Sequence, residues 1–302
     1  MKSEKIFKNE IIVFVSAMIC CLLWGSAFPC IKIGYKLFEI SSGDTFAQIL
    51  FAGIRFFFAG LFTVILGSIS ERRILIPSKR SLPMIAVLAL FQTVLQYIFF
   101  YMGVARTTGI KGSILNSSNV FLAILISALL LHQERISAKK LIGCALGFAG
   151  VVVINLSGFE LSFNIGDMFI ILSATAYAFS SAFIKKFSQS ESPVMLSGYQ
   201  FMLGGAFMAL FGCASGGRLT VITPIGAAIL AYLSMLSCIA FTLWGLLLKY
   251  NPVSKITVYG FMNPVFGVIL SAIILSETGS FSAIQLMLSL ALIAAGIITV
   301  NR

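Results

Sequence analysis

Long apolar runs alternate with short polar gaps along nearly the whole chain. A helix needs about 20 residues to cross the hydrocarbon core of a bilayer, and most of the runs have about that length. The runs cover residues 11–31, 47–69, 82–104, 110–131, 139–156, 165–184, 194–213, 222–248, 253–275 and 282–300. No gap is long enough for a soluble domain. The pattern therefore predicts an all-α integral membrane protein with ten transmembrane helices.

The composition excludes a water-soluble globule. Hydrophobic residues make up 59% of the chain, charged residues only 10%, and the mean hydropathy is +1.03. A soluble domain carries about a quarter charged residues. The basic residues before the first run also fit a signal peptide, but the run continues past Trp24 without a small-residue cleavage site, which favours a retained helix.

The basic residues predict the orientation. Counted by alternate loops, fifteen Lys and Arg lie on one side of the ten predicted helices and five on the other. The positive-inside rule then places both termini in the cytoplasm. The basic loops also account for the net charge of +11. Because the chain has no nucleic-acid-binding motif, we expect no nucleic-acid partner.

The two halves of the chain resemble each other at a nearly constant offset. The segment 52–62, AGIRFFFAGLF, matches 197–207, SGYQFMLGGAF, and places Phe56 on Phe201. The segment 147–155 similarly matches 292–301. Each copy holds five predicted spans, an odd number, so the second copy enters the membrane the other way up. Inverted repeats are typical of alternating-access transporters, with the substrate site between the halves.

Several motifs are similar to a known family. LLWGSAFPCIKIG in the first span, RFFFAG in the second and LLLHQERIS…LIGCALGFAGVVVI across the fourth and fifth resemble the EamA domain of the drug/metabolite transporter superfamily. The later part recurs as NPVFGVILSAIILSE…LIAAGIITV. The resemblance divides the chain into repeats at 11–156 and 165–301. One departure is SNVFL at 118–122, where such domains often carry Glu-Pro or Asn-Pro; only the ninth span keeps Asn263-Pro264.

The resemblance implies a secondary carrier of the bacterial inner membrane that most often exports amino acids or other small metabolites. Some relatives import instead, so an importer or exchanger stays open, and an inverted repeat can also line a channel. The expected partners are a small-molecule substrate and the lipid bilayer. A monomer is plausible, but the sequence does not determine the oligomeric state.

No catalytic or metal-binding cluster is evident. An embedded enzyme needs grouped His, Asp, Glu or Cys side chains at membrane depth, and the predicted spans contain none. The six cysteines form no C-x-x-C pair, and His132 is the only histidine. We therefore expect no enzyme activity, cofactor or metal. All ten acidic residues lie in gaps or at span ends, which disfavours a proton relay through a buried carboxylate.

Arg55 is the one charge well inside an apolar run. An arginine at membrane depth either contacts an anionic group, such as a substrate carboxylate, or binds backbone carbonyls and serves the structure. Its repeat equivalent is the uncharged Gln200. The sequence alone favours the structural interpretation.

Polar and aromatic side chains within the spans are the remaining candidates for a substrate cavity. With Arg55 and Gln200, they are Trp24, Gln92, Gln96, Tyr97, Tyr101, Asn116, Asn119, Tyr177, Trp244, Tyr259 and Asn263. Several pairs are spaced to share one helix face, including Asn116 with Asn119 and Tyr259 with Asn263. Glu134 and Glu277 end equivalent spans at opposite faces, where they either stabilise helix ends or act as gates.

Overall fold

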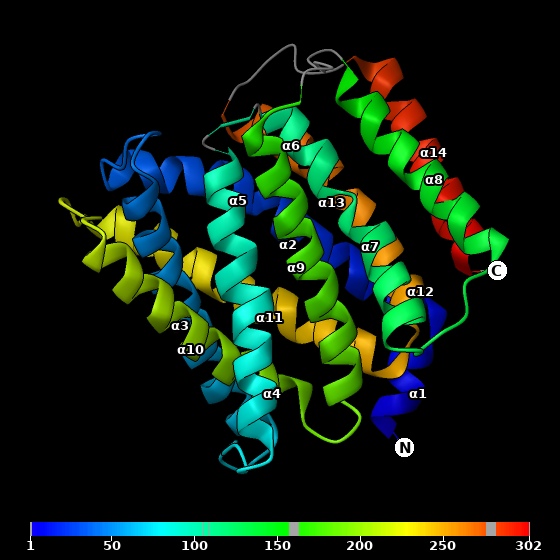
Figure 1. Ribbon diagram of the computed structural model, residues 1–302, viewed down its shortest axis with the longest axis horizontal. Helices are drawn as coiled ribbons and strands as arrows, with labels where there is room; N and C mark the ends of the chain where they lie inside the picture. The colour runs from blue at the N-terminus through cyan, green and yellow to red at the C-terminus, as the bar shows by residue number, and fades with distance from the viewer. Residues whose placement is uncertain (1, 105, 108, 157–162, 276–281, 302) are drawn as a thin grey trace.

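The computed structural model describes residues 2–104, 106–107, 109–156, 163–275 and 282–301, and these form a bundle of helices (Figure 1). The unbroken helices are α1 (Lys2–Lys8), α2 (Glu10–Leu37), α3 (Thr45–Ser70), α8 (Ala138–Ile154), α9 (Ile165–Phe187), α10 (Pro193–Ala214), α11 (Pro224–Tyr250) and α14 (Ala283–Asn301). Among the described residues, nine helical segments are long and apolar enough to cross a membrane. The predicted all-helical membrane protein is confirmed. α8, with 17 residues, is about 26 Å long and lies beside α14.

Three of the spans are interrupted. The third consists of α4 (Ser81–Leu88), the π-helix η1 (Ala89–Leu95) and α5 (Gln96–Val104). The fourth consists of α6 (Gly109–Asn116), α7 (Asn119–Leu125) and the π-helix η2 (Ile126–Leu130). The ninth consists of α12 (Val253–Thr257), the 3₁₀ helix η4 (Val258–Phe261) and α13 (Met262–Ile274). Interruptions of this kind are frequent at functional sites.

One of these interruptions has a local cause, and a second is a tighter turn of the backbone. Pro264 lies in the first turn of α13, and a proline has no N–H to donate to the carbonyl four residues earlier, so the 3₁₀ turn precedes it. In the fourth span the break is a tighter turn, because the amides of Ser118 and Val120 donate to carbonyls three residues earlier, Leu115 at 3.1 Å and Ser117 at 3.3 Å. The two candidate pairs therefore do not lie within one continuous helix: Asn116 and Asn119 lie on either side of the break, and Tyr259 is in η4 while Asn263 is in α13.

Polar side chains define where many of the helices begin. The residue before the helix accepts a backbone N–H from the first turn in α2, α3, α8, α9, α10 and α11, which satisfies donors that the helix itself leaves free. At α9 the bond is reciprocal, because Asn164 and Asp167 each accept the other's backbone N–H. Short polar gaps in the sequence are thus sufficient to start the long apolar helices.

The helices pack in pairs drawn from the two halves of the chain. α3 lies along α10, and α8 lies along α14 at one edge of the bundle (Figure 1). α2 packs against α11 and α13, while α9 packs against α5 and the α6–α7 span. α3 also contacts α11, and α10 contacts α4 and η1. The halves are therefore interleaved rather than folded as separate units.

The contact between α3 and α10 is a seam of glycines. A Cβ added to Gly60 would lie 2.5 Å from the Gly198 carbonyl oxygen and from the Met202 amide nitrogen, and one added to Gly205 would lie 2.4 Å from the Phe57 amide nitrogen. Both distances are shorter than any real Cβ contact, and the atoms that would be hit belong to the backbone. Small residues let membrane helices approach closely and gain packing energy. The seam therefore requires glycine.

We expect Gly60→Ala and Gly205→Ala to destabilise the protein by about 1–3 kcal/mol each, the usual cost of overpacking. Gly43→Ala is the matched control, since nothing lies within 4 Å of its added methyl group. The measurement is the melting temperature of the detergent-solubilised protein by size-exclusion chromatography after heating. Equal melting temperatures for all three variants would contradict the seam.

Candidate functional site

Arg55 projects from α3 into the bundle and is bound to α11. Its side chain is 3% exposed; Nε donates to the Leu233 carbonyl oxygen at 3.3 Å and to Ser237 Oγ at 3.2 Å, and Nη2 donates to Ser237 Oγ at 2.9 Å. Arg55 therefore does not snorkel to water. The guanidinium carbon also lies 5.1 Å from the ring centroid of Phe56, a cation–π contact.

One nitrogen of the Arg55 guanidinium has no hydrogen-bond partner among the described residues. Within the part of the chain that the structure describes, Nη1 makes no hydrogen bond and Arg55 has no carboxylate within ion-pair distance. Tyr97 lies close by, since its ring centroid is 4.3 Å from that of Phe56, the ring that Arg55 contacts. A buried cation beside aromatic rings with no counter-ion of its own can accept an anionic ligand.

A continuous chain of aromatic rings passes beside this arginine. Trp24 lies 5.0 Å from both Trp244 and Phe241, measured between ring centroids. Phe241 lies 4.9 Å from Phe201, Phe201 lies 5.2 Å from Phe56, and Phe56 lies 4.3 Å from Tyr97. Tyr97 is in turn near Tyr101, and Tyr177 packs against the same cluster. Six of the predicted candidates, Trp24, Arg55, Tyr97, Tyr101, Tyr177 and Trp244, are thus brought together.

Buried polar atoms without partners lie in the same region. Trp24 Nε1 and Trp244 Nε1, whose rings touch, make no hydrogen bond to any described residue. Buried polar groups are normally satisfied, so each of these calls for a partner such as water or a ligand. The aromatic cluster therefore offers donors as well as apolar surface.

Gln200 and Gln92 serve a different contact. Thr93 Oγ1 donates to Gln200 Oε1 at 2.7 Å, and Gln200 Nε2 donates to Gln92 Oε1 at 3.1 Å. All three side chains are buried, at 0–5% exposure, and they join α10 to the π-helix η1. A satisfied network of this kind holds helices together in a membrane.

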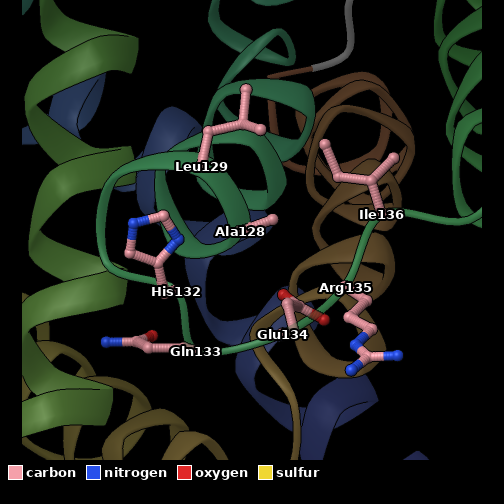
Figure 2. Close-up of a pocket in the computed structure, with 7 residues that line it drawn as sticks. All are labelled: Ala128, Leu129, His132, Gln133, Glu134, Arg135 and Ile136. Atoms are coloured by element: carbon pink, nitrogen blue, oxygen red, sulfur yellow. The ribbon is translucent and has the colours of Figure 1, made fainter.

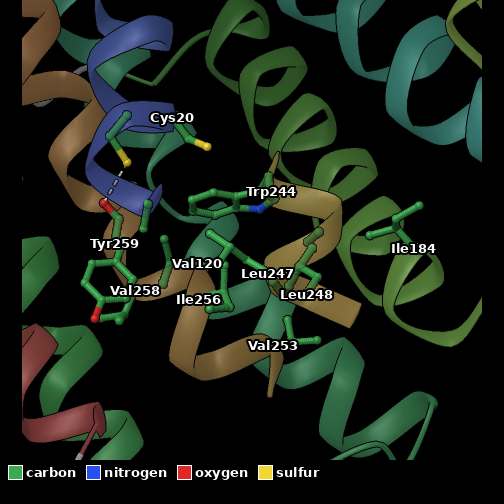
Figure 3. Packing of buried hydrophobic residues seen from close by; sticks show 14 of the residues in the cluster. Cys20, Val120, Ile184, Trp244, Leu247, Leu248, Val253, Ile256, Val258 and Tyr259 are labelled. Atoms are coloured by element: carbon green, nitrogen blue, oxygen red, sulfur yellow. Dashed lines mark hydrogen bonds between the residues drawn. The ribbon is translucent and has the colours of Figure 1, made fainter. Parts of the chain in front are cut away.

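The remaining polar candidates lie at the interrupted spans. Asn119 Nδ2 donates to the Asn116 carbonyl oxygen at 2.6 Å across the break between α6 and α7. Gln96 Oε1 and Asn263 Oδ1 are buried without a partner among the described residues. Tyr259 is separate from the rest: Figure 3 shows its hydroxyl pointing away from Trp244 and Leu247, and the hydroxyl accepts a hydrogen bond from Asn301 Nδ2 at 3.3 Å.

Glu134 joins the end of the fourth span to the start of the ninth. Its Oε1 accepts the Ser254 amide at 3.0 Å, its Oε2 accepts the Ser254 hydroxyl, and Lys140 Nζ lies 2.6 Å from Oε2. Figure 2 shows it beside His132 and Arg135 in a surface pocket of about 540 Å³. Its repeat equivalent Glu277 lies outside the described residues.

Asp167 is more buried than its position at a span end suggests. Its side chain is 0% exposed, Oδ2 lies 2.5 Å from Lys111 Nζ, and Thr107 Oγ1 donates to Oδ1 at 2.5 Å. The ion pair ties the start of α6 to the start of α9. The bonds satisfy the carboxylate, which gives it a structural role. No group of three or more His, Cys, Asp or Glu that could hold a metal occurs among the described residues.

Sequence reasoning missed the residues that surround Arg55. Ser237 is one of many serines in apolar runs, and Phe201 and Phe56 are indistinguishable from lipid-facing phenylalanines by composition. Both phenylalanines are nevertheless 0% exposed. The one signal that could have found them is that they occupy equivalent positions in the two repeats.

Comparisons with known proteins define the class. The chain matches the EamA-like transporter family over residues 11–156 and again over 164–302. An uncharacterized transporter of Archaeoglobus fulgidus is 30% identical over 86% of this chain and 88% of its own length. YvbV of Bacillus subtilis, also an uncharacterized transporter, is 26% identical over 93% of this chain and 88% of its own length. The uncharacterized inner membrane transporter YedA of Escherichia coli is 24% identical over 90% of this chain and 86% of its own length.

A solved crystal structure superposes on the chain with a TM-score of 0.76 at 17% identity, covering 96% of each chain, which shows a shared fold. The helical bundle and its relatives together define a multi-pass membrane transporter. The chain belongs to the EamA-like transporter family. The family resemblance seen in the sequence is thereby confirmed.

Removing the Ser237 hydroxyl tests the anchoring of Arg55. We expect Ser237→Ala to lower stability by about 1.5–3 kcal/mol, the range for hydrogen bonds to a charged group. Ser234→Ala is the matched control: Ser234 is also buried on α11 and also donates to the carbonyl four residues earlier, at 2.8 Å, but it does not contact Arg55. Melting temperatures of the two purified variants give the comparison. An equal loss in both would show that the bond to Arg55 contributes nothing.

Proposed function

We propose that the protein is a secondary carrier that exports amino acids or similar carboxylate-bearing metabolites by alternating access between two inverted repeats of five helices. One observation carries this proposal: the hydrogen bond that Arg55 makes to α11 has a counterpart in the other half of the chain. There, Gln200 donates to Gln92 between α10 and the third span.

The two bonds involve equivalent positions. Gln200 lies 145 positions after Arg55, and Ser237 lies 145 positions after Gln92. Each bond therefore joins the second helix of one half to the third helix of the other. The packing follows the same rule, since α2 against α11 and α13 corresponds to α9 against α5 and the α6–α7 span. This supports an inverted repeat with α8 as a tenth crossing.

The surroundings of Arg55 favour a carboxylate as the recognised group. An arginine at the centre of a membrane helix costs about 2.5–3.5 kcal/mol on insertion scales. Leu233 and Ser237 satisfy two guanidinium nitrogens but contribute no negative charge. A substrate carboxylate at Nη1 would supply it, and the chain of rings from Trp24 to Tyr97 would accept an apolar side chain.

We assign Glu134 to a gate on the side of the membrane that holds most of the basic loops. It fastens the end of the fourth span to Ser254 at the start of the ninth, and the ninth span also packs on α7 there. Opening a path from the aromatic cluster to this side requires these two broken helices to separate. Breaking the contact between Glu134 and Ser254 would allow the fourth and ninth spans to separate.

Export of a carboxylate-bearing solute is expected to depend on Arg55. Cells that produce the protein are loaded with a mixture of amino acids and other metabolites, and the medium is analysed by mass spectrometry. We expect one class of carboxylates to leave faster, and Arg55→Gln to abolish the increase at equal protein level because the charge is lost. Uptake without export would instead indicate an importer. Unchanged efflux in Arg55→Gln would contradict the ligand role.

Counterflow separates a carrier from a channel. Once efflux has identified a substrate, proteoliposomes preloaded with it are diluted into a trace of labelled substrate. A carrier is expected to accumulate the label transiently and to saturate as substrate rises, because each crossing requires a change of conformation. Flux that neither saturates nor shows counterflow would establish a channel.

A further inference from the structure

A second site lies on the outer flank of the bundle, away from Arg55. It is a groove of about 660 Å³ between α2, the ninth span and α14. Its walls are mostly apolar and partly exposed: Phe14 and Ile298 are both 49% exposed, and Leu290 is 37% exposed. In a protein that crosses a membrane, such a flank faces lipid.

One end of the groove is polar and carries both signs of charge. Glu10, Lys255, Tyr259 and Asn301 line it there, at the start of α2, the start of α12, η4 and the end of α14. The Tyr259 hydroxyl accepts from Asn301 and has its own proton left to donate. A groove that is apolar along its length and polar at one end has the same distribution of polarity as a lipid.

The two charges at this end are not paired tightly. Glu10 Oε1 and Lys255 Nζ are 3.9 Å apart, whereas Glu4 and Lys8 on α1 approach to 2.7 Å. Charge-assisted hydrogen bonds between ammonium and carboxylate are about 2.7–2.9 Å long, so the Glu10–Lys255 pair is open. The Glu10 side chain is also 87% exposed. Both charges are available to an incoming headgroup.

The length of the groove fits one leaflet. On α14 it extends from Asn301 to Leu290, eleven residues or about 16 Å along the helix axis, half of the roughly 30 Å hydrocarbon core. On α2 it extends from Glu10 to Met18, about 12 Å. An acyl chain would thus occupy the groove down to the middle of the bilayer.

We propose that this groove binds a zwitterionic phospholipid with a primary ammonium in its headgroup, of the phosphatidylethanolamine type. The phosphate is held by the Lys255 ammonium and the Tyr259 hydroxyl, and the lipid ammonium is held by the Glu10 carboxylate. A quaternary ammonium has no N–H to donate to Glu10. An anionic glycerol headgroup leaves Glu10 without a cation and adds repulsion.

Native mass spectrometry of the purified protein tests the site. The protein is exchanged into an equimolar mixture of phosphatidylethanolamine, phosphatidylcholine and phosphatidylglycerol, and the retained adducts are counted. We expect retention of phosphatidylethanolamine about tenfold above the other two, the effect of one charge-assisted hydrogen bond. Equal retention of all three, or preference for phosphatidylglycerol, would overturn the proposal.

Charge variants identify the partners. Glu10→Gln is expected to reduce phosphatidylethanolamine to the level of phosphatidylcholine, and Lys255→Gln to weaken both because they share the phosphate. Glu4→Gln is the control, since Glu4 is an acidic residue of the neighbouring helix α1 that does not line the groove. A loss as large in Glu4→Gln as in Glu10→Gln would show that only the net charge matters.

Filling the groove provides a test that does not depend on charge. Ala294→Phe places a ring in the groove and is expected to displace the lipid, whereas Ala295→Phe, at the next position of α14, which is also exposed, does not. Equal adduct loss in both would mean that the lipid is bound only as part of the surrounding annulus. Because both sites are exposed, neither ring disturbs the packing of the bundle.

Discussion

The glycine seam between α3 and α10 is the constraint on which the rest of the bundle depends. Without side chains at Gly60 and Gly205, the two backbones meet directly, and a Cβ at either position would clash with the backbone of the facing helix. Each helix comes from a different half of the chain, so the seam fixes the halves relative to each other. It also fixes Arg55 and Gln200, which project from the same two helices toward α11 and the third span.

The two halves carry different side chains at equivalent positions of α3 and α10. Gln200 is neutral, and both its amide oxygen and its amide nitrogen are hydrogen-bonded, to Thr93 and Gln92. Arg55 occupies the equivalent position with a charge that its protein partners do not neutralise. Equivalent sequence positions in the two halves thus hold one hydrogen-bonded amide and one charge that still lacks a counter-ion. Substrate recognition under the proposed function is a property of this asymmetry, not of the repeat itself.

Apolar periodicity and short polar gaps were sufficient to predict a helical membrane protein, because membrane crossing imposes a length on each helix. The internal match also placed Phe56 on Phe201. It could not show that these rings are buried, since lipid and protein interiors favour the same residues. The break at Ser117 depends on local backbone bonds, and the Tyr259 hydroxyl is bonded to Asn301, which is distant in sequence. Neither feature has a hydropathy signal.

The alternatives posed for Arg55, a structural bond or a substrate contact, are compatible in this structure. Ser237 and the Leu233 carbonyl bind Nε and Nη2, and this fixes the plane of the guanidinium. A fixed plane aims Nη1 in one direction and reduces the entropy that a ligand would lose in ordering it. The structural bonds therefore prepare the arginine for a carboxylate.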